Sequence, residues 1–407
     1  MTSEIIWQIE QAKNGEKTLL MNKHYLYSKY NPREGVARWV EAEVRKADSY
    51  LLIGVGLGYH LHCLVNKGFK KHIYVYCFNQ AEFDLFKAYN INNDWWVNEK
   101  VSFIFDFEKI NFKTDVQLLL PNQVVKALGV NHPLHQGLEY AKMNLLSFKK
   151  YGAIMEENFH ENLLRNDHSI VQFEENKTKI SCLVAAGPSL NETVEWIKGL
   201  ESKIDIYVVG AALKVLLMNQ IKPKGIVLTD ANEITKIQFE GVSFEGELYY
   251  LSTANYKTVA NYKGNKKIIF QKDYSLAKQH AKEYGLPLIE TGGSVGTTCF
   301  SLLQFLGYET IVLFGQDLGF IGNKTHARLS PSISEIDSNT SLRTVKANDG
   351  SNIFTTPSLQ SFQFWYNNKM KITKAKVYNT AKKGAKIYNV PLIDKKEFEI
   401  LVKKFQG

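Results

Sequence analysis

The chain has 407 residues, of which 44% are hydrophobic and 22% charged, and its formal net charge is +9. This length predicts two or more domains with sizeable cores, and the composition is typical of an ordered protein. The Lys and Arg residues are spread along the chain without an arginine-rich stripe. This pattern argues against nucleic-acid binding and is compatible with an anionic substrate.

The sequence also lacks the signals of several other protein classes. No uninterrupted apolar run approaches ~18 residues, and the first residues lack the basic and apolar regions of a signal peptide. We therefore expect a cytoplasmic protein without a membrane span. The four cysteines are widely spaced and form no Cys-x-x-Cys pair, so we expect free thiols rather than a zinc or redox site.

The first part of the chain, residues 1–130, predicts a small Rossmann-like α/β domain. Apolar residues at helical spacing over 34–46 predict a helix, and a second helix is expected after the first strand. The predicted strands are 50–54, 71–77, 101–105 and 116–120.

The segment Gly54-Val-Gly-Leu-Gly58 lies between the first of these strands and the helix after it. Folds that bind a dinucleotide at such a loop need an acidic residue at the end of the next strand. Here that strand ends in Cys77-Phe-Asn79, and the nearest carboxylates are Glu82 and Asp84. We therefore predict a structural turn rather than a ligand site.

The rest of the chain divides into three predicted parts. Residues 131–170 predict a helical linker, 171–330 a central domain, and 331–407 a mainly helical C-terminal region with helices near 359–371 and 395–405. Helical stretches alternate with strands in the central domain, which predicts a doubly wound, mainly parallel, Rossmann-like sheet. Its expected strands are 180–185, 204–209, 225–228, 248–251, 267–270, 286–289 and 310–314.

Small and polar residues follow several of these strands, at the edge where ligands bind in open α/β sheets. Gly187 permits close approach of a ligand, and the next helix offers free N–H groups to a phosphate. The same stretch matches a capping box, with Ser189 as the cap and Glu192 three residues later. The two interpretations are compatible.

Two further strand ends carry candidate ligand groups. Thr291-Gly-Gly-Ser294 precedes an apolar helix, and its hydroxyl and N–H groups suit a carboxylate or phosphate. The alternative is an N-cap at Ser294 with glycines for close packing. Asp230 and Asn232 suit the hydroxyls or base of a nucleoside, or else cap their loop.

Gln316 and Asp317 end the most apolar strand. A carboxylate buried there needs a partner, which is either a ligand or a structural hydrogen bond. His326 lies in the following loop, and an ordinary pKa of about 6.5 suits a general base. The chain contains no Asp-x-Asp motif and no cluster of histidines with Cys, Asp or Glu, so we predict no metal site.

A combination of segments matches a known family. They are 25–32, 52–60, 185–190, 291–295, 315–318, 325–327 and 377–387. With them the chain resembles, over nearly its full length, the Maf (motility-associated factor) glycosyltransferases of the DUF115 group. Their central domain is similar to bacterial sialyltransferases. The resemblance implies inverting, metal-independent transfer of a nonulosonic acid, such as pseudaminic or legionaminic acid, from its CMP-activated form to Ser or Thr of flagellin.

On this interpretation the strand ends form one CMP-sugar site, with no cofactor beyond the donor. His326 is the candidate base, and Asp317 is the alternative. The residues expected to bind the donor are Gly187, Pro188, Ser189, Asp230, Asn232, Thr291, Gly292, Gly293, Ser294 and Gln316. Two other functions stay open: a pyrophosphotransferase like 6-hydroxymethylpterin diphosphokinase, which DUF115 relatives include, and a non-catalytic flagellin-binding protein.

Overall fold

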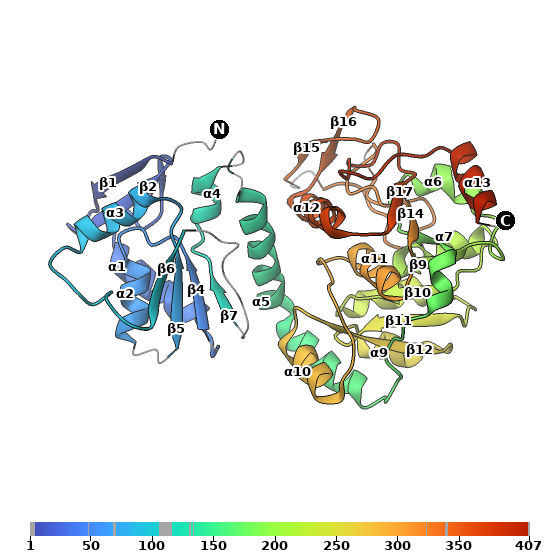
Figure 1. The fold of residues 1–407 in the computed structure, drawn as a ribbon, viewed down its shortest axis with the longest axis horizontal. Helices are drawn as coiled ribbons and strands as arrows, with labels where there is room; N and C mark the ends of the chain where they lie inside the picture. The colour runs from blue at the N-terminus through green and yellow to red at the C-terminus, as the bar shows by residue number, and fades with distance from the viewer. Residues whose placement is uncertain are drawn as a thin grey trace. The chain divides into compact units, whose positions relative to one another are not determined.

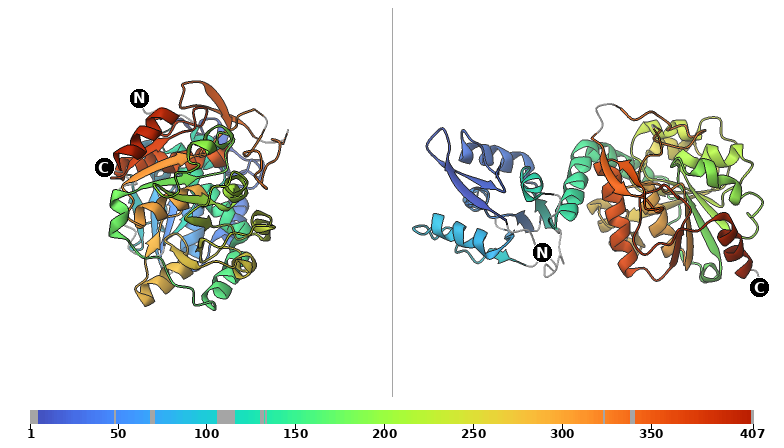
Figure 2. Two further views of the ribbon diagram at one scale, coloured as in Figure 1. Left: turned by 90° about the vertical axis from the view of Figure 1, so that its right-hand side faces the viewer. Right: turned by 90° about the horizontal axis from the view of Figure 1, so that it is seen from above.

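The structure is a computed structural model that describes residues 5–47, 49–67, 71–105, 116–129, 132, 134–322, 324–337 and 341–405. The chain divides into two compact units, Met1–Lys142 and Met143–Gly407, and the boundary falls inside the long helix α5 (His135–Leu163). Each unit contains a parallel sheet with helices packed against it (Figures 1 and 2). In the part of the chain described, no helix is both long and apolar enough to cross a membrane.

The N-terminal unit contains the four strands that the sequence predicts, paired in parallel in the order β6-β5-β4-β7. Pro32 occupies the first turn of α1, and Val36 and Val40, one helical turn apart, are buried against the core. The elements are β4 (Ser49–Ile53), β5 (His72–Tyr76), β6 (Val101–Ile104), β7 (Val116–Leu119), α1 (Pro32–Glu43), α2 (Tyr59–Asn66), α3 (Gln80–Tyr89) and α4 (Val124–Leu128).

A small antiparallel sheet precedes α1 and was not predicted. It consists of β1 (Trp7–Gln11), β2 (Lys17–Met21) and β3 (His24–Tyr25). Asn22 and Lys23, between β2 and β3, both have positive φ angles, +49° and +66°. Hairpin turns of this geometry usually contain glycine, and neither residue here is glycine, so the turn was difficult to predict from the sequence.

The glycine-rich turn between β4 and α2 is structural, as predicted. The buried carboxylate of Glu82, on α3, accepts hydrogen bonds from the N–H of Gly56 at 2.9 Å and of Phe78 at 2.8 Å. A carboxylate of the chain itself therefore binds the Gly56 N–H of the turn, and the Tyr27 hydroxyl accepts from the Leu57 N–H at 3.0 Å. Burial raises the pKa of Glu82 to about 7, although its backbone hydrogen bonds act in the opposite direction.

The C-terminal unit is built on an eight-stranded parallel sheet with the order β13-β12-β11-β10-β9-β8-β14-β17. All seven strands predicted for the central domain are present. They are β8 (Ile180–Val184), β9 (Asp205–Val209), β10 (Gly225–Leu228), β11 (Glu247–Leu251), β12 (Lys266–Gln271), β13 (Leu288–Ile289) and β14 (Thr310–Phe314). The chain winds outward from β8 to β13 and then returns to pair β14 on the other side of β8. The doubly wound fold is thus confirmed.

Helices connect these strands. They are α6 (Leu190–Thr193), α7 (Gly210–Met218), α8 (Lys236–Phe239), α9 (Tyr256–Asn261), α10 (Ser275–Tyr284) and α11 (Val295–Phe305). Where the sequence predicts a helix after Gly187, the chain forms the single turn α6 and then a short 3₁₀ turn, Val194–Trp196. The direction of winding reverses after β13, and right-handed crossovers then place α11 on the opposite face of the sheet.

The C-terminal region contains the two predicted helices, α12 (Pro357–Ile372) and α13 (Lys395–Lys404), and also three strands that were not predicted. β15 (Arg343–Lys346) and β16 (Asn352–Thr355) form a hairpin, and β17 (Lys376–Asn379) extends the large sheet beside β14. β17 escaped prediction because it is short and ends in Asn379, a polar residue that is fully buried. All four cysteines are free thiols, as expected.

Candidate functional site

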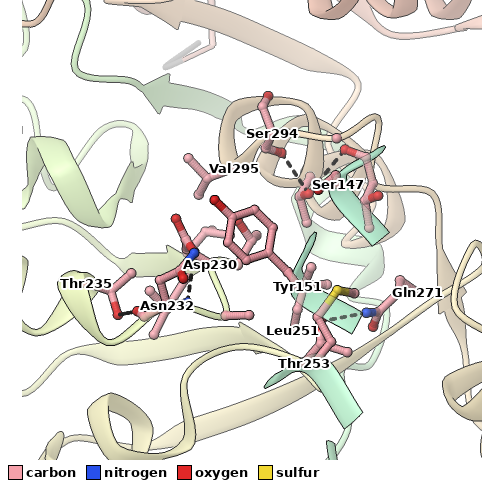
Figure 3. Close-up of a pocket in the computed structure, with 18 of the residues that line it drawn as sticks. Ser147, Tyr151, Asp230, Asn232, Thr235, Leu251, Thr253, Gln271, Ser294 and Val295 are labelled. Atoms are coloured by element: carbon pink, nitrogen blue, oxygen red, sulfur yellow. Dashed lines mark hydrogen bonds between the residues drawn. The ribbon is translucent and has the colours of Figure 1, made fainter. Parts of the chain in front are cut away.

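A cavity of about 450 Å³ lies at the carboxyl edge of the large sheet, within the C-terminal unit. Residues that follow four neighbouring strands, β10 to β13, line it, together with the start of α7 (Figure 3). The strand-end residues are Thr229, Asp230, Ala231, Asn232, Thr253, Asp273, Tyr274, Thr291, Gly293 and Ser294. This is the edge at which open α/β sheets bind ligands.

One face of α5 forms another wall of the cavity. Asn144, Ser147, Phe148, Tyr151 and Met155 line it, at intervals of three and four residues that place them on one side of the helix. Tyr151 projects into the cavity between Asp230 on one side and Ser294 on the other (Figure 3). The sequence predicted this helix only as a linker, because its lining residues carry no recognisable motif.

Two buried asparagines fasten α5 to the strand ends. The Asn158 amide donates to the carbonyls of Ala231 at 3.0 Å and Thr253 at 3.1 Å. One turn later, the Asn162 amide donates to the carbonyls that flank Thr253, at 3.0 and 2.8 Å. These bonds fix the loops after β10 and β11, which line the cavity. Two asparagines four residues apart on a predicted helix are the feature of the sequence that could have indicated this contact between α5 and the sheet.

The loop after β10 positions Asp230 and Asn232, which both line the cavity. The Oδ1 atom of Asp230 accepts hydrogen bonds from the backbone N–H and the side-chain amide of Asn232, both at 2.9 Å. The loop-capping interpretation is therefore confirmed, and it coexists with a position at the cavity.

The loop between β13 and α11 contributes Thr291, Gly293 and Ser294 to the cavity. Gly292 and Gly293 have φ angles of +63° and +86°, and a Cβ on Gly292 would lie 2.6 Å from the Trp365 ring. Ser294 caps α11, as its alternative interpretation predicted, since its hydroxyl accepts from the Thr297 N–H at 3.2 Å. Both glycines are therefore required by the backbone.

Helix α12 supports this loop from behind. The indole N–H of Trp365 donates to Glu290 at 2.9 Å, and the ammonium of Lys369 lies 2.9 Å from the other Glu290 oxygen. The residue before Thr291 is thereby tied to the C-terminal region.

Asp273, which follows β12, is a cavity residue that the sequence analysis did not identify. Its Oδ2 atom accepts a hydrogen bond from the Thr291 hydroxyl at 2.8 Å. Asp273 is an exposed residue on the wall of the cavity. Desolvation by the protein atoms packed around it raises the pKa of this carboxyl, and the Thr291 hydrogen bond opposes the rise.

A second group of predicted residues meets where β14 and β8 end. The carboxylate of Asp317 accepts from the Ser189 N–H at 2.7 Å and from the Ser189 hydroxyl. A Cβ on Gly187 would lie 2.4 Å from the carbonyl oxygen of Gly315 and 2.7 Å from Asp317. The predicted capping box at Ser189 is wrong, because its hydroxyl bonds to Asp317 instead of the helix N–H groups.

Asp317 is 2% exposed, and burial raises its pKa to about 6 despite the bonds from Ser189. Gln316 is buried against Gly296. His326 is half-buried with Nδ1 3.0 Å from the Thr325 hydroxyl, and burial lowers its pKa.

The structure therefore divides the predicted site residues between two places. Asp230, Asn232, Thr291, Gly293 and Ser294 line the cavity. The others are not among its lining residues: Gly187, Pro188, Ser189, Gly292, Gln316, Asp317 and His326.

Hydroxyl and amide groups supply most of the polar side chains of the cavity. Two carboxylates, Asp230 and Asp273, face it, and none of the described residues that line it is Lys, Arg or His. The starts of α7, at Gly210, and of α11, at Val295, supply N–H groups and the positive ends of helix dipoles. Across the described ranges, no group of three or more His, Cys, Asp or Glu side chains is placed to hold a metal ion. The side chains of the cavity thus suit a hydroxyl-rich ligand, and the two helix starts are the places where an anionic group of that ligand could bind.

Comparison with known proteins agrees with this fold. A family model described as "6-hydroxymethylpterin diphosphokinase MptE-like" matches residues 156–323. The solved structure of a Maf glycosyltransferase from Magnetospirillum magneticum AMB-1 matches 98% of this chain and 73% of its own, with a TM-score of 0.52 and 14% identity. The resemblance to the Maf family is therefore confirmed at the level of the fold.

Two other comparisons add nothing to this. A hydrogen sulfide-producing enzyme from Fusobacterium nucleatum matches 76% of this chain and 93% of its own at 14% identity, but its TM-score of 0.15 supports no conclusion. No curated protein matches the sequence.

Proposed function

We propose that this chain, whose fold resembles that of a Maf glycosyltransferase, transfers a sugar from a nucleotide-activated donor bound in the cavity. The observation that carries the proposal is the cavity itself, at the ends of β10 to β13 and lined by hydroxyls, amides and two helix starts. Its volume of about 450 Å³ falls within the range of small-molecule sites.

The donor that we propose is a CMP-activated nonulosonic acid, of the pseudaminic or legionaminic type, and the acceptor is a Ser or Thr hydroxyl of flagellin. Asp230 and Asn232 would bind hydroxyls or base edges of the nucleoside. Thr291, Gly293 and Ser294, at the start of α11, would bind the donor carboxylate, and the start of α7 would face the phosphate. The preformed dipoles of these helix starts would stabilise charge as CMP departs.

The residues where β14 meets β8 have no donor contact in this proposal. Gly187, Ser189 and Asp317 are engaged with one another, and that arrangement supports a structural role. The predicted role of His326 as a base stays a prediction, and it requires an acceptor hydroxyl to reach a residue outside the cavity lining.

Intact mass measurement tests the function. The protein is incubated with unmodified flagellin and either CMP-pseudaminic acid or CMP-legionaminic acid. We expect the flagellin mass to rise by one or more nonulosonic acid residues with one of the two donors. CMP release without a mass increment on flagellin would contradict the proposed acceptor, and a lack of CMP binding would contradict the proposed donor.

The family match over residues 156–323 favours a second candidate, a pyrophosphotransferase acting on 6-hydroxymethylpterin. That reaction uses ATP and Mg²⁺. Formation of AMP from ATP in the presence of 6-hydroxymethylpterin and Mg²⁺ would support it. AMP formation together with inactivity toward both CMP-sugars would replace the first proposal.

A further inference from the structure

We propose that Asp273 is the catalytic base that deprotonates the acceptor hydroxyl. This inference rests on the proposed glycosyl transfer and names the group that carries its proton. Asp273 could not be identified from the sequence, because it belongs to no motif and lies 18 residues before its partner Thr291.

The position of Asp273 relative to the donor carries the argument. In a nonulosonic acid the carboxylate is bonded directly to the anomeric carbon. If that carboxylate lies at the start of α11, the reacting carbon is one bond away from it. Asp273 is joined to this same loop, because the Thr291 hydroxyl donates to its Oδ2 atom at 2.8 Å. The base and the reacting carbon are thus brought to the same end of the cavity.

The Thr291–Asp273 pair is held in place by neighbouring hydroxyls. The backbone carbonyl of Thr291 accepts from the Thr297 hydroxyl at 2.5 Å and from the Thr298 hydroxyl at 3.2 Å. Thr297 and Thr298 are buried in the first turns of α11. The first turns of α11 therefore hold Thr291, whose hydroxyl donates to the Asp273 carboxylate, and a positioned base favours proton transfer.

The other acids and the histidine are less well placed. The Oδ1 atom of Asp230 holds its own loop through two bonds from Asn232. The carboxylate of Asp317 is occupied by Ser189, and neither Asp317 nor His326 lines the cavity. Desolvation by the surrounding protein also raises the pKa of Asp273, which favours a base.

The step balances as follows. The acceptor oxygen forms a bond to the anomeric carbon while its proton moves to Asp273. The bond between that carbon and the phosphate oxygen breaks, and CMP leaves with the electron pair. Attack from the face opposite CMP inverts the anomeric configuration, and Asp273 then returns the proton to water.

The decisive variant is Asp273→Asn, which retains the shape and the acceptor for the Thr291 hydroxyl. We expect its transfer rate to flagellin to fall by 10²–10⁴-fold, the usual contribution of a general base. CMP affinity, measured by calorimetry, should change by less than about threefold, because the base acts on the acceptor. Glu283→Gln, on the exposed face of the following helix α10, is the matched control and should transfer at the wild-type rate.

Azide separates a base from a merely structural residue. As an anion, azide needs no deprotonation, so Asp273→Ala should convert the CMP-sugar to a glycosyl azide of inverted configuration faster than it transfers to flagellin. Asp273→Asn with near wild-type transfer would overturn the proposal. Loss of CMP binding in both variants would also overturn it. So would a failure of azide to restore cleavage of the CMP-sugar by Asp273→Ala. Inactive wild-type protein would instead overturn the glycosyltransferase assignment itself.

Discussion

Two aspartates that follow different strands of the large sheet, β14 and β12, show how the surroundings of a residue decide its role. Asp317 lies where β14 ends, and both hydrogen-bonding groups of Ser189 satisfy its carboxylate. Asp273 has one protein donor from another residue, Thr291, and faces the cavity. Asp317 was identified from the sequence because it follows a strongly apolar strand. Its partner could not be predicted, because Ser189 lies 128 residues away in the chain.

If Asp317 is structural, Asp317→Asn should destabilise the chain. An amide accepts through one oxygen only, so one Ser189 donor would be left unsatisfied at a cost of about 1–3 kcal/mol. Ser189→Ala should also destabilise, and the double variant should lose less than the sum of the two, because the residues share one contact. Thermal unfolding measures these effects. Wild-type stability in Asp317→Asn together with abolished transfer would instead indicate a catalytic role.

Glu82 provides a pH-dependent prediction for the N-terminal unit. Burial raises the pKa of Glu82 to about 7, so the protonated side chain is favoured in the folded state. Its contribution to stability is fully present below about pH 4.5 and is lost as the pH rises through 7. His60 acts in the opposite direction, because burial lowers its pKa to about 3 and stability then rises with pH up to about 6.5. The difference between Glu82→Gln and wild type isolates the glutamate.

We expect wild type to lose stability relative to Glu82→Gln between pH 4.5 and 7.5, by up to about 3 kcal/mol. Urea unfolding followed by tryptophan fluorescence is suitable, since Trp7, Trp39, Trp95 and Trp96, four of the six tryptophans, belong to this unit. A difference that does not vary with pH would contradict the raised pKa.

At the scale of elements, α5 is the main unexpected contributor to the site. The sequence predicts its helical periodicity but not its register against the sheet, which depends on Asn158 and Asn162 reaching carbonyls about 73–95 residues away in the chain. The β17 strand is a similar case, because a four-residue segment pairs only after the rest of the sheet exists.

Replacing either asparagine with alanine should loosen the cavity wall. Each change removes an amide that donates to two carbonyls, and we expect about 1–3 kcal/mol of destabilisation. Hydrogen exchange should quicken in the loops after β10 and β11, near 229–232 and 252–255, and CMP should bind more weakly. An Asn66→Ala change on the exposed end of α2 serves as the control. Unchanged exchange in both loops would show that α5 does not hold them.

At the scale of the whole molecule, the sequence predicts the two parallel sheets because long apolar strands alternate with helices. It also predicts five of the residues that line the cavity, Asp230, Asn232, Thr291, Gly293 and Ser294. It does not separate them from the residues at β8 and β14, because all follow apolar strands in the same way. Only the strand order shows that the cavity lies over β10 to β13, while β8 and β14 are neighbours elsewhere in the sheet.

The central claim is that this cavity binds the nucleotide, and CMP calorimetry tests it most directly. Val295 lines the cavity at the start of α11, so Val295→Trp should fill it and weaken CMP binding by at least tenfold. His326→Ala, outside the cavity, should bind CMP within twofold of wild type. Unchanged CMP affinity in Val295→Trp, with loss of affinity in His326→Ala, would contradict the account and move the site to the ends of β8 and β14.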